Sequence, residues 1–216
     1  MTALVLVGAG GLTREAMNIV RASDESISMR VLDDNPATWG SSLDGVEVAG
    51  GLDLLGEYAD HQVVVCMGRG TLRRTVVHRI RHAGVARERF ASLVHPRVLV
   101  PANCSVGVGS VVMEGVVLTA DVTVGDHVVL MPHVTLTHGN VVHDYATICA
   151  GVALGGDVEV GPEAYVGMNA CVRERVRIGR RSTLGMGAVL LHDLPGGETW
   201  VGSPAHTVNP RLEVAR

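Results

Sequence analysis

The segment from Val98 to Asp193 repeats every six residues. It divides into sixteen consecutive blocks without an insertion, and the third residue of every block is Val, Leu or Ile. These residues are Val100, Val106, Val112, Leu118, Val124, Leu130, Leu136, Val142, Ile148, Leu154, Val160, Val166, Val172, Ile178, Leu184 and Leu190. A period of six does not match a helix, but it matches a strand of two or three residues followed by a turn. The sequence therefore predicts a coil of short strands.

The first position of each block should share the inward face with the third, because side chains alternate along a strand. This position is mostly small or β-branched, and Asn140 is the clearest polar exception. Its members include Val98, Cys104, Ser110, Val116, Val122, Val128, Val134, Ala146, Val152 and Val158. Glycine recurs at the fourth position, as Gly107, Gly125, Gly155, Gly161, Gly167, Gly179 and Gly185. We expect these glycines at corners that need a positive φ or a close backbone approach.

This repeat resembles that of the hexapeptide acyltransferases, in which three blocks form one triangular coil of a left-handed parallel β-helix. The resemblance implies about five coils. Residues eighteen apart then stack, and one interior ladder should contain Val100, Leu118, Leu136, Leu154, Val172 and Leu190. The single Phe of the chain fits a narrow, aliphatic interior. We expect the β-helix over residues 93–193, with a C-terminal tail over 194–216.

The first 92 residues lack the period of six and alternate between strand and helix patterns. Short apolar runs at 3–7, before Asp33, and at 63–67 predict buried strands, and Leu12 opens an amphipathic helix. After the third strand, Leu72, Val76 and Ile80 should form the buried face of a helix, with Arg73, Arg74, Arg79 and Arg81 on its other faces. The sequence predicts a small Rossmann-like domain over 1–92, with the boundary between Ser92 and Arg97.

A glycine turn follows the first strand of this domain. Gly8, Gly10 and Gly11 precede a helix, so backbone N–H groups there can approach a phosphate closely. The acidic pair Asp33 and Asp34 follows about twenty residues later, at the distance from which a carboxylate can reach a ribose or base. Thr13 stands where the third glycine of the dinucleotide fingerprint belongs. An ordinary strand-to-helix turn therefore stays open as an alternative.

Composition limits the remaining classes of function. The net charge of −4 and the isoelectric point of 6.2 argue against a nucleic-acid surface. No apolar stretch is long enough to span a membrane, and the N-terminus has no signal-peptide pattern. We therefore expect a cytoplasmic protein. The four cysteines show no CxxC spacing, so they are interpreted as reduced packing residues.

The two domains together resemble the bacterial nucleotide-sugar N-acetyltransferases and the related sialic-acid O-acetyltransferases. The shared motifs are GAGG with Arg14 and Glu15, DDNP at 33–36, LVHP at 93–96, the hexad run, and VGSPA at 201–205. The resemblance implies that the first domain holds a nucleotide-linked amino sugar, with Leu12 near the sugar, and that the β-helix holds acetyl-CoA. It also implies a homotrimer with active sites between subunits. Rows of apolar residues on flat β-helix faces favour the same assembly.

The same resemblance assigns a general base to His138. An imidazole is suited to deprotonating an acceptor amine near neutral pH. Gly156 lies eighteen residues later, and its backbone N–H is expected to face the thioester carbonyl. The family usually has Asp or Glu after this histidine, but the chain has Gly139. Asn140 and Asp144 are the candidates for orienting the ring.

Further residues match the positions where family members bind the coenzyme. These are Gly167, Met168, Gly185, Met186, Gly187 and Ala188 along the pantetheine arm, and Pro204 of VGSPA near the adenine. Relatives usually follow that motif with Lys or Arg, where this chain has His206. No metal is expected in the acetyltransferase interpretation.

The sequence leaves three alternative functions open. The first is acetylation of a hydroxyl of a sugar or of sialic acid. The second is a zinc enzyme resembling the γ-carbonic anhydrases, because His133 and His138 have an H-x4-H spacing. In that case His95, His127 or His143 would have to supply the third ligand. The third is a sugar-nucleotide-binding scaffold that has lost catalysis together with the acidic residue at position 139.

Overall fold

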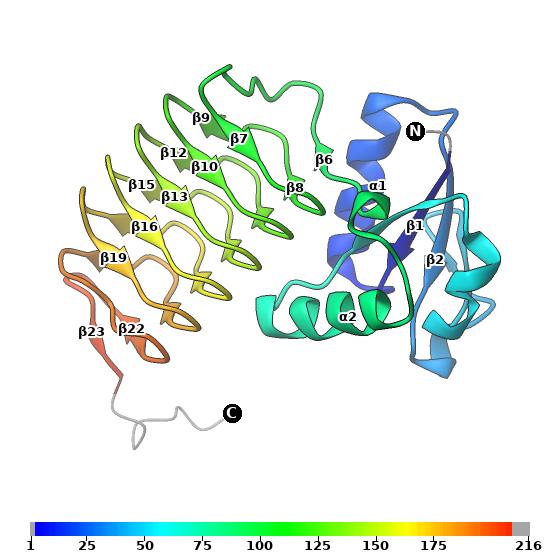
Figure 1. Cartoon of the computed structure of the whole chain (residues 1–216). Coiled ribbons are helices and arrows are strands. Elements are labelled where there is room, and N and C mark those ends of the chain that lie inside the picture. Colours follow the sequence, from blue (N-terminus) through cyan, green and yellow to red (C-terminus); the bar gives the residue numbers. More distant parts are fainter. Residues whose placement is uncertain (1–2, 209–216) are drawn as a thin grey trace.

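The computed structural model describes residues 3–208 and contains a small α/β domain beside a left-handed parallel β-helix (Figure 1). The sheet of the first domain has the order β3-β4-β2-β1-β5. Its strands are β1 (Ala3–Val7), β2 (Ser28–Leu32), β3 (Ser42–Leu43), β4 (Val46–Gly50) and β5 (Gln62–Val65). All pairs are parallel except β3 with β4. This is the Rossmann-like arrangement that the sequence predicts.

Two α-helices and short 3-10 turns complete this domain. They are α1 (Gly11–Ser23), α2 (Gly70–His82), η1 (Pro36–Thr38), η2 (Leu52–Tyr58) and η3 (Arg87–Arg89). Leu4 and Leu6 of β1 pack with α1 and with Val111 and Val129 of the β-helix. The opposite side of the sheet packs with α2 and η2. The domain core is therefore continuous with one outer surface of the β-helix.

Three sheets form the β-helix, and all their strand pairs are parallel except β22 with β23. The first, the charged face, contains β7 (Ser105–Val106), β10 (Thr123–Val124), β13 (Val141–Val142), β16 (Glu159–Val160) and β19 (Arg177–Ile178). The second, the covered face, contains β6 (Leu93–Val94), β8 (Val111–Val112), β11 (Val129–Leu130), β14 (Thr147–Ile148), β17 (Tyr165–Val166), β20 (Thr183–Leu184), β22 (Thr199–Val201) and β23 (His206–Thr207). The third, the apolar face, contains β9 (Val117–Leu118), β12 (Thr135–Leu136), β15 (Ala153–Leu154), β18 (Cys171–Val172) and β21 (Val189–Leu190).

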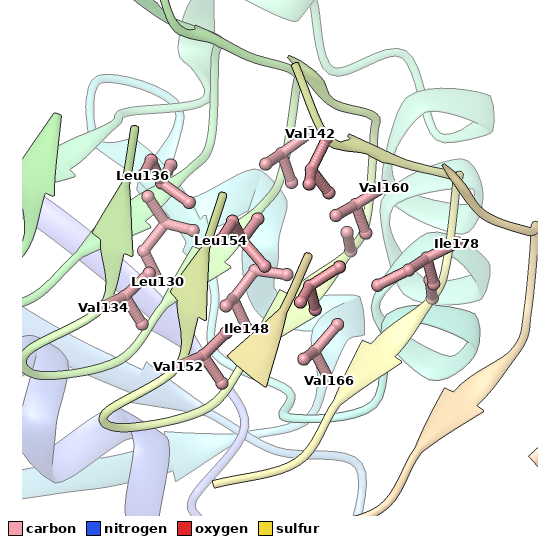
Figure 2. Close-up of a cluster of buried hydrophobic side chains, with 14 of the residues drawn as sticks. Leu130, Val134, Leu136, Val142, Ile148, Val152, Leu154, Val160, Val166 and Ile178 are labelled. Carbon is pink, nitrogen blue, oxygen red and sulfur yellow. The ribbon is translucent and has the colours of Figure 1, made fainter. Parts of the chain in front are cut away.

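The period of six fixes the packing of the interior. Strands pair with partners eighteen residues away, as Leu136 does with Leu154. First and third block positions point inward and form one continuous core, part of which Figure 2 shows. Each fully buried Val or Leu contributes about 1.5–3 kcal/mol relative to an exposed one. The predicted ladder is confirmed from Leu118 to Leu190, whereas Val100 is only partly buried and lies outside a strand.

The corners of the β-helix differ from the prediction in the block position that has a positive φ. Positive φ angles occur at the sixth block position, which carries Gly in five blocks and mostly Asp, His, Asn or Arg in the others, as at Asp121 and His133. The fourth-position glycines instead lie where the next coil approaches closely. A Cβ on Gly107, for example, would overlap the backbone of Gly125. The expectation of close approach is therefore confirmed, and that of positive φ at the fourth position is wrong.

The β-helix also extends beyond the hexad run. Leu93 of β6 pairs with Val111, so the covered face begins before Val98. At the other end, Thr199 of β22 pairs with Thr183, although no hexad marks this segment. The domain boundary between Ser92 and Arg97 stays a prediction.

Helix α2 differs from its prediction in which face is buried. Leu72 is exposed, whereas Arg73 is fully buried between the first domain and the β-helix. The guanidinium of Arg73 donates to the backbone oxygens of His127, Tyr145 and Ala146 at 2.7–3.0 Å. Burial lowers the pKa of Arg73 to about 10. The helix therefore turns a charged residue inward because the β-helix corner supplies carbonyl acceptors for it.

Candidate active site

His138 lies on the edge where the apolar face meets the charged face, which we call the His138 edge. Its side chain is 68% exposed, and its ring lies against Gly156 of the next coil. A Cβ on residue 156 would overlap the imidazole, so only glycine leaves room for this ring position. The eighteen-residue register therefore brings the two residues together.

The backbone N–H of Gly156 is free to bind a ligand atom. Within residues 3–208, the N–H of Gly156 has no hydrogen-bond acceptor. The side chain of Asn140, which is fully buried, donates to the carbonyl oxygen of Gly155 at 2.7 Å. Because a trans peptide directs its C=O and N–H to opposite sides, this bond inside the prism leaves the N–H of Gly156 directed outward.

Neither residue proposed to orient His138 contacts its ring. Asn140 points into the interior because it occupies the inward first position of its block. Asp144 lies on another edge, where its Oδ1 accepts from the backbone N–H of Asp126 at 2.8 Å. The carboxylate beside His138 is that of Asp157, with Oδ1 at 4.0 Å from Nδ1. Sequence reasoning missed Asp157, although its register eighteen residues from Gly139 could have identified it.

The proposed coenzyme residues lie on two edges of the prism. Gly156 is on the His138 edge, whereas Gly167, Met168, Gly185, Met186 and Gly187 are on the edge between the covered and apolar faces. Met168 and Met186 on that edge are exposed at 47% and 73%. Ala188 is buried in the interior, and Pro204 lies exposed in the turn between β22 and β23. The apolar face separates these two edges.

A hollow of about 560 Å³ continues the His138 edge toward the C-terminal coils. Its lining includes Arg173, Arg175 and His192, together with Glu174 and Asp193. It lies two to three coils beyond His138, since Glu174 and His192 occupy the same block position as the histidine. This edge therefore offers basic groups in line with the imidazole.

The glycine turn lines a separate cleft of about 1050 Å³ between the first domain and the covered face. Gly8, Gly10, Gly11 and Leu12 contribute to its wall. On the β-helix side it is lined by Met131, Glu163, Tyr165, Arg181, Ser182 and Thr183. This volume is sufficient for a nucleotide-sized ligand.

The two acidic residues near the glycine turn, Asp33 and Asp34, have different roles. Asp33 lines the cleft, but its Oδ2 accepts from the backbone N–H of Ala9 at 2.6 Å and so braces the turn. Asp34 is outside the cleft lining and pairs with Arg79. A hydrogen bond from Arg79 lowers the pKa of Asp34. The structure therefore gives Asp34 a structural partner and brings only Asp33 to the cleft.

A buried charge cluster closes one end of this cleft. The Glu163 side chain is 2% exposed and contacts Arg180 at 2.7 Å, Arg181 at 3.0 Å and Arg74 at 3.5 Å. Burial alone would raise the pKa of Glu163, but the hydrogen bonds from Arg180 and Arg181 lower it overall. The cluster joins α2 to the β-helix and places Arg181 at the cleft wall. No pattern in the sequence predicts this charge cluster.

His138 does not line the cleft that contains the glycine turn. His133 and His138 also lie on different edges, although five residues separate them. Over residues 3–208, no group of three or more His, Cys, Asp or Glu is arranged to hold a metal ion. The same range contains no helix that is long and apolar enough to cross a membrane.

Comparison with known proteins connects both domains to one group of enzymes. Residues 3–80 match the family model of the PglD N-terminal domain. A mutant of perosamine N-acetyltransferase from Caulobacter crescentus, solved with CoA and GDP-perosamine, is similar over 97% of this chain and 98% of its own. It has 25% sequence identity and a TM-score of 0.89.

Two further solved structures match nearly the whole chain. The acetyltransferase domain of PglB from Neisseria gonorrhoeae FA1090, in complex with acetyl coenzyme A, has 28% identity and a TM-score of 0.85 over 95% of this chain and 98% of its own. WeeI from Acinetobacter baumannii AYE has 25% identity and a TM-score of 0.87 over 96% of this chain and 100% of its own. No curated protein sequence matches the chain.

Proposed function

Because the chain belongs to the hexapeptide-repeat nucleotide-sugar acetyltransferases, we propose that it transfers an acetyl group from acetyl-CoA to the amino group of a nucleotide-linked amino sugar. The observation that carries the proposal is the pairing of His138 with Gly156 on an open β-helix edge. Relatives with CoA and GDP-perosamine bound share this fold over their whole length, which supports both substrates.

In the proposed reaction, the amine nitrogen attacks the thioester carbonyl carbon directly. The new C–N bond forms as the C–S bond breaks, and His138 moves the proton from nitrogen toward the departing CoA sulfur. No covalent enzyme intermediate is needed. The unused N–H of Gly156 stabilises the negative charge that develops on the carbonyl oxygen.

The proposed active site includes residues of two chains in a homotrimer. His138 and the glycine-turn cleft are apart within one chain, so a neighbouring copy has to bring a sugar bound in its cleft to the histidine. The outward residues of the apolar face are Val117, Thr135, Ala153, Cys171 and Val189, which form an uncharged stripe between the two edges that carry the coenzyme residues. Packing of this stripe against a second copy would bury it and join those edges.

Acetyl-CoA is proposed to lie along the His138 edge. Its thioester contacts His138 and Gly156, and its phosphates reach the hollow that contains Arg173 and Arg175. Met168 and Met186 of the neighbouring chain then cover the pantetheine arm, which accounts for their exposure in one chain. Arg173 and Arg175 would then supply the positive charge that relatives usually carry at the position of His206.

Titration calorimetry of acetyl-CoA into protein of measured zinc content tests this proposal. The expected result is saturable binding to zinc-free protein, with as many sites as chains. Stoichiometric zinc without acetyl-CoA binding would contradict the proposal and favour a zinc protein. Binding of a sugar nucleotide without any acetyl-CoA binding would favour a scaffold.

A further inference from the structure

We propose that Asp157 is the acidic positioning residue for His138, supplied by the coil that follows the histidine because Gly139 leaves space for its carboxylate. The inference rests on the proposed role of His138 as general base. It accounts for the missing acidic residue at position 139 without requiring that catalysis be lost.

The β-helix register places Asp157 at this point of the edge. Gly139 and Asp157 occupy the same sixth block position, eighteen residues apart, with φ angles of 69° and 58°. The backbone N–H of Asp157 donates to the carbonyl oxygen of His138 at 2.9 Å, which fixes one residue beside the other. The carboxylate Oδ1 lies 4.0 Å from Nδ1 of the imidazole.

The absence of a side chain at Gly139 is part of the arrangement. A Cβ on residue 139 would overlap Oδ1 of Asp157. A side chain at 139 and the observed carboxylate position are therefore mutually exclusive. The chain has an acidic side chain at one of the two stacked positions and leaves the other empty.

The Asp157 carboxylate lies between two basic side chains, those of His138 and Arg175. Its Oδ2 lies 3.9 Å from Nε of Arg175 on the following coil, while Oδ1 faces His138. Among residues 3–208, Asp157 is the only carboxylate within 4.0 Å of the His138 ring nitrogens. Asn140 and Asp144 are committed to other partners.

This geometry sets the proton arrangement of the imidazole. A carboxylate that accepts from Nδ1–H keeps the lone pair on Nε2, which is then free to take the proton of the acceptor amine. The proton stays on His138, and the carboxylate stabilises the imidazolium without being protonated itself. Both side chains are exposed in one chain, so a small rotation closes 4.0 Å to a hydrogen bond when substrates bind.

The substitution Asp157→Asn tests the proposal while keeping shape and backbone preference, because Asn tolerates a positive φ. Asp121→Asn is the matched control. Asp121 occupies the same block position on the same edge with a φ of 54°, is exposed, and accepts from Asn103 rather than from a histidine. Two readouts are measured for each: steady-state kinetics with acetyl-CoA and an amino-sugar nucleotide, and the nitrogen-15 shifts of the His138 ring.

We expect D157N to lower kcat at least roughly tenfold with little change in either KM, and to raise the fraction of His138 protonated on Nε2. D121N should match the wild type in both readouts. Equal kcat and equal ring shifts in D157N and D121N would overturn the proposal. The ring shifts decide the positioning role even if no acetyl transfer is found, so failure of the proposed function is distinguishable.

A double-variant cycle tests the coupling to Gly139. Gly139→Ala should lower kcat in the wild type by displacing the carboxylate, and should add little further loss in D157N. Fully additive losses would contradict the claim that Gly139 acts by making space for Asp157.

Discussion

The two ends of the charged face show how one repeat serves different purposes. At the His138 edge, Asp157, His138 and Arg175 are exposed and lie 3.9–4.0 Å apart, outside hydrogen-bond distance. At the opposite edge, which we call the docking edge, His127 and Glu163 are buried against the first domain with close partners. The corner positions of one repeat therefore supply adjustable groups for chemistry at one edge and a fixed interface at the other.

The difference follows from what covers each edge. The docking edge is covered by α2, so the charges of Arg73 and Glu163 have lost water and depend on their hydrogen bonds. Within the described part of the chain, residues 3–208, His138 and Asp157 on the His138 edge are exposed and keep their solvation. We infer that substrates and a neighbouring chain cover this edge during turnover. Substitutions at the two edges should therefore affect different quantities.

The largest effect is expected at the His138 edge. His138→Ala should reduce kcat about a thousandfold, equivalent to roughly 4 kcal/mol of transition-state stabilisation, because the proton of the amine loses its acceptor. The melting temperature should stay unchanged, since the ring is exposed. His133→Ala, on the edge between the covered and apolar faces, is the control for general effects of histidine removal. Equal losses in both variants would show that the effect is not specific to His138.

The apolar face provides the next prediction. Ala153→Arg places an unpaired charge in the proposed interface and should cost about 3 kcal/mol per contact. Analytical ultracentrifugation should then show monomers, and acetyl transfer should fall with assembly. Thr123→Arg on the charged face is the matched control, because Thr123 is also exposed and points outward. A trimeric, fully active A153R protein would contradict the shared active site.

The next prediction concerns the contribution of Arg73 to stability at the docking edge. Arg73→Met should lower the free energy of unfolding by about 2–3 kcal/mol, because backbone oxygens of the β-helix corner lose their buried donor. Arg81→Met on the exposed side of α2 should change it little. Urea denaturation of the two variants measures the difference. An R73M protein as stable as R81M would show that the guanidinium is not needed for docking.

A pH effect of about 2 kcal/mol is expected from His127. Burial lowers the pKa of His127 to about 4, below its usual 6.5, where its ring stacks on Tyr145. The unfolded chain therefore binds a proton at higher pH than the folded one, and stability present above pH 6.5 is lost as the pH falls toward 4. His127→Asn should remove about 2 kcal/mol of the stability difference between pH 7 and pH 5. An unchanged pH dependence in H127N would assign the acid sensitivity to other groups.

The hexad pattern predicts the interior better than the surface. Burial at the first and third positions follows from strand alternation alone, so the ladder from Leu118 to Leu190 could be predicted without long-range information. The burial of Arg73 could not, because its acceptors on the β-helix lie at least 54 residues away and the charge of an arginine predicts exposure to solvent. The strands at 199–207 carry no hexad and were expected as a tail.

The candidate site also could be predicted only in part. The stacking of His138 on Gly156 follows from the eighteen-residue register, which the sequence contains. The sequence suggests Asn140 and Asp144 as partners of the imidazole, whereas the structure brings Asp157 from the next coil. In a β-helix the spatial neighbour of a corner residue is eighteen positions away, and local motifs do not report it.

The central claim is tested most directly by the product of the reaction. The purified protein is incubated with acetyl-CoA and GDP-perosamine or another nucleotide-linked amino sugar, and product mass and NMR spectra are recorded beside those for H138A. The account predicts a sugar nucleotide acetylated on nitrogen, formed with equimolar free CoA by the wild type and almost absent with H138A. Equal product formation by H138A, or acetylation only on a hydroxyl, would contradict it.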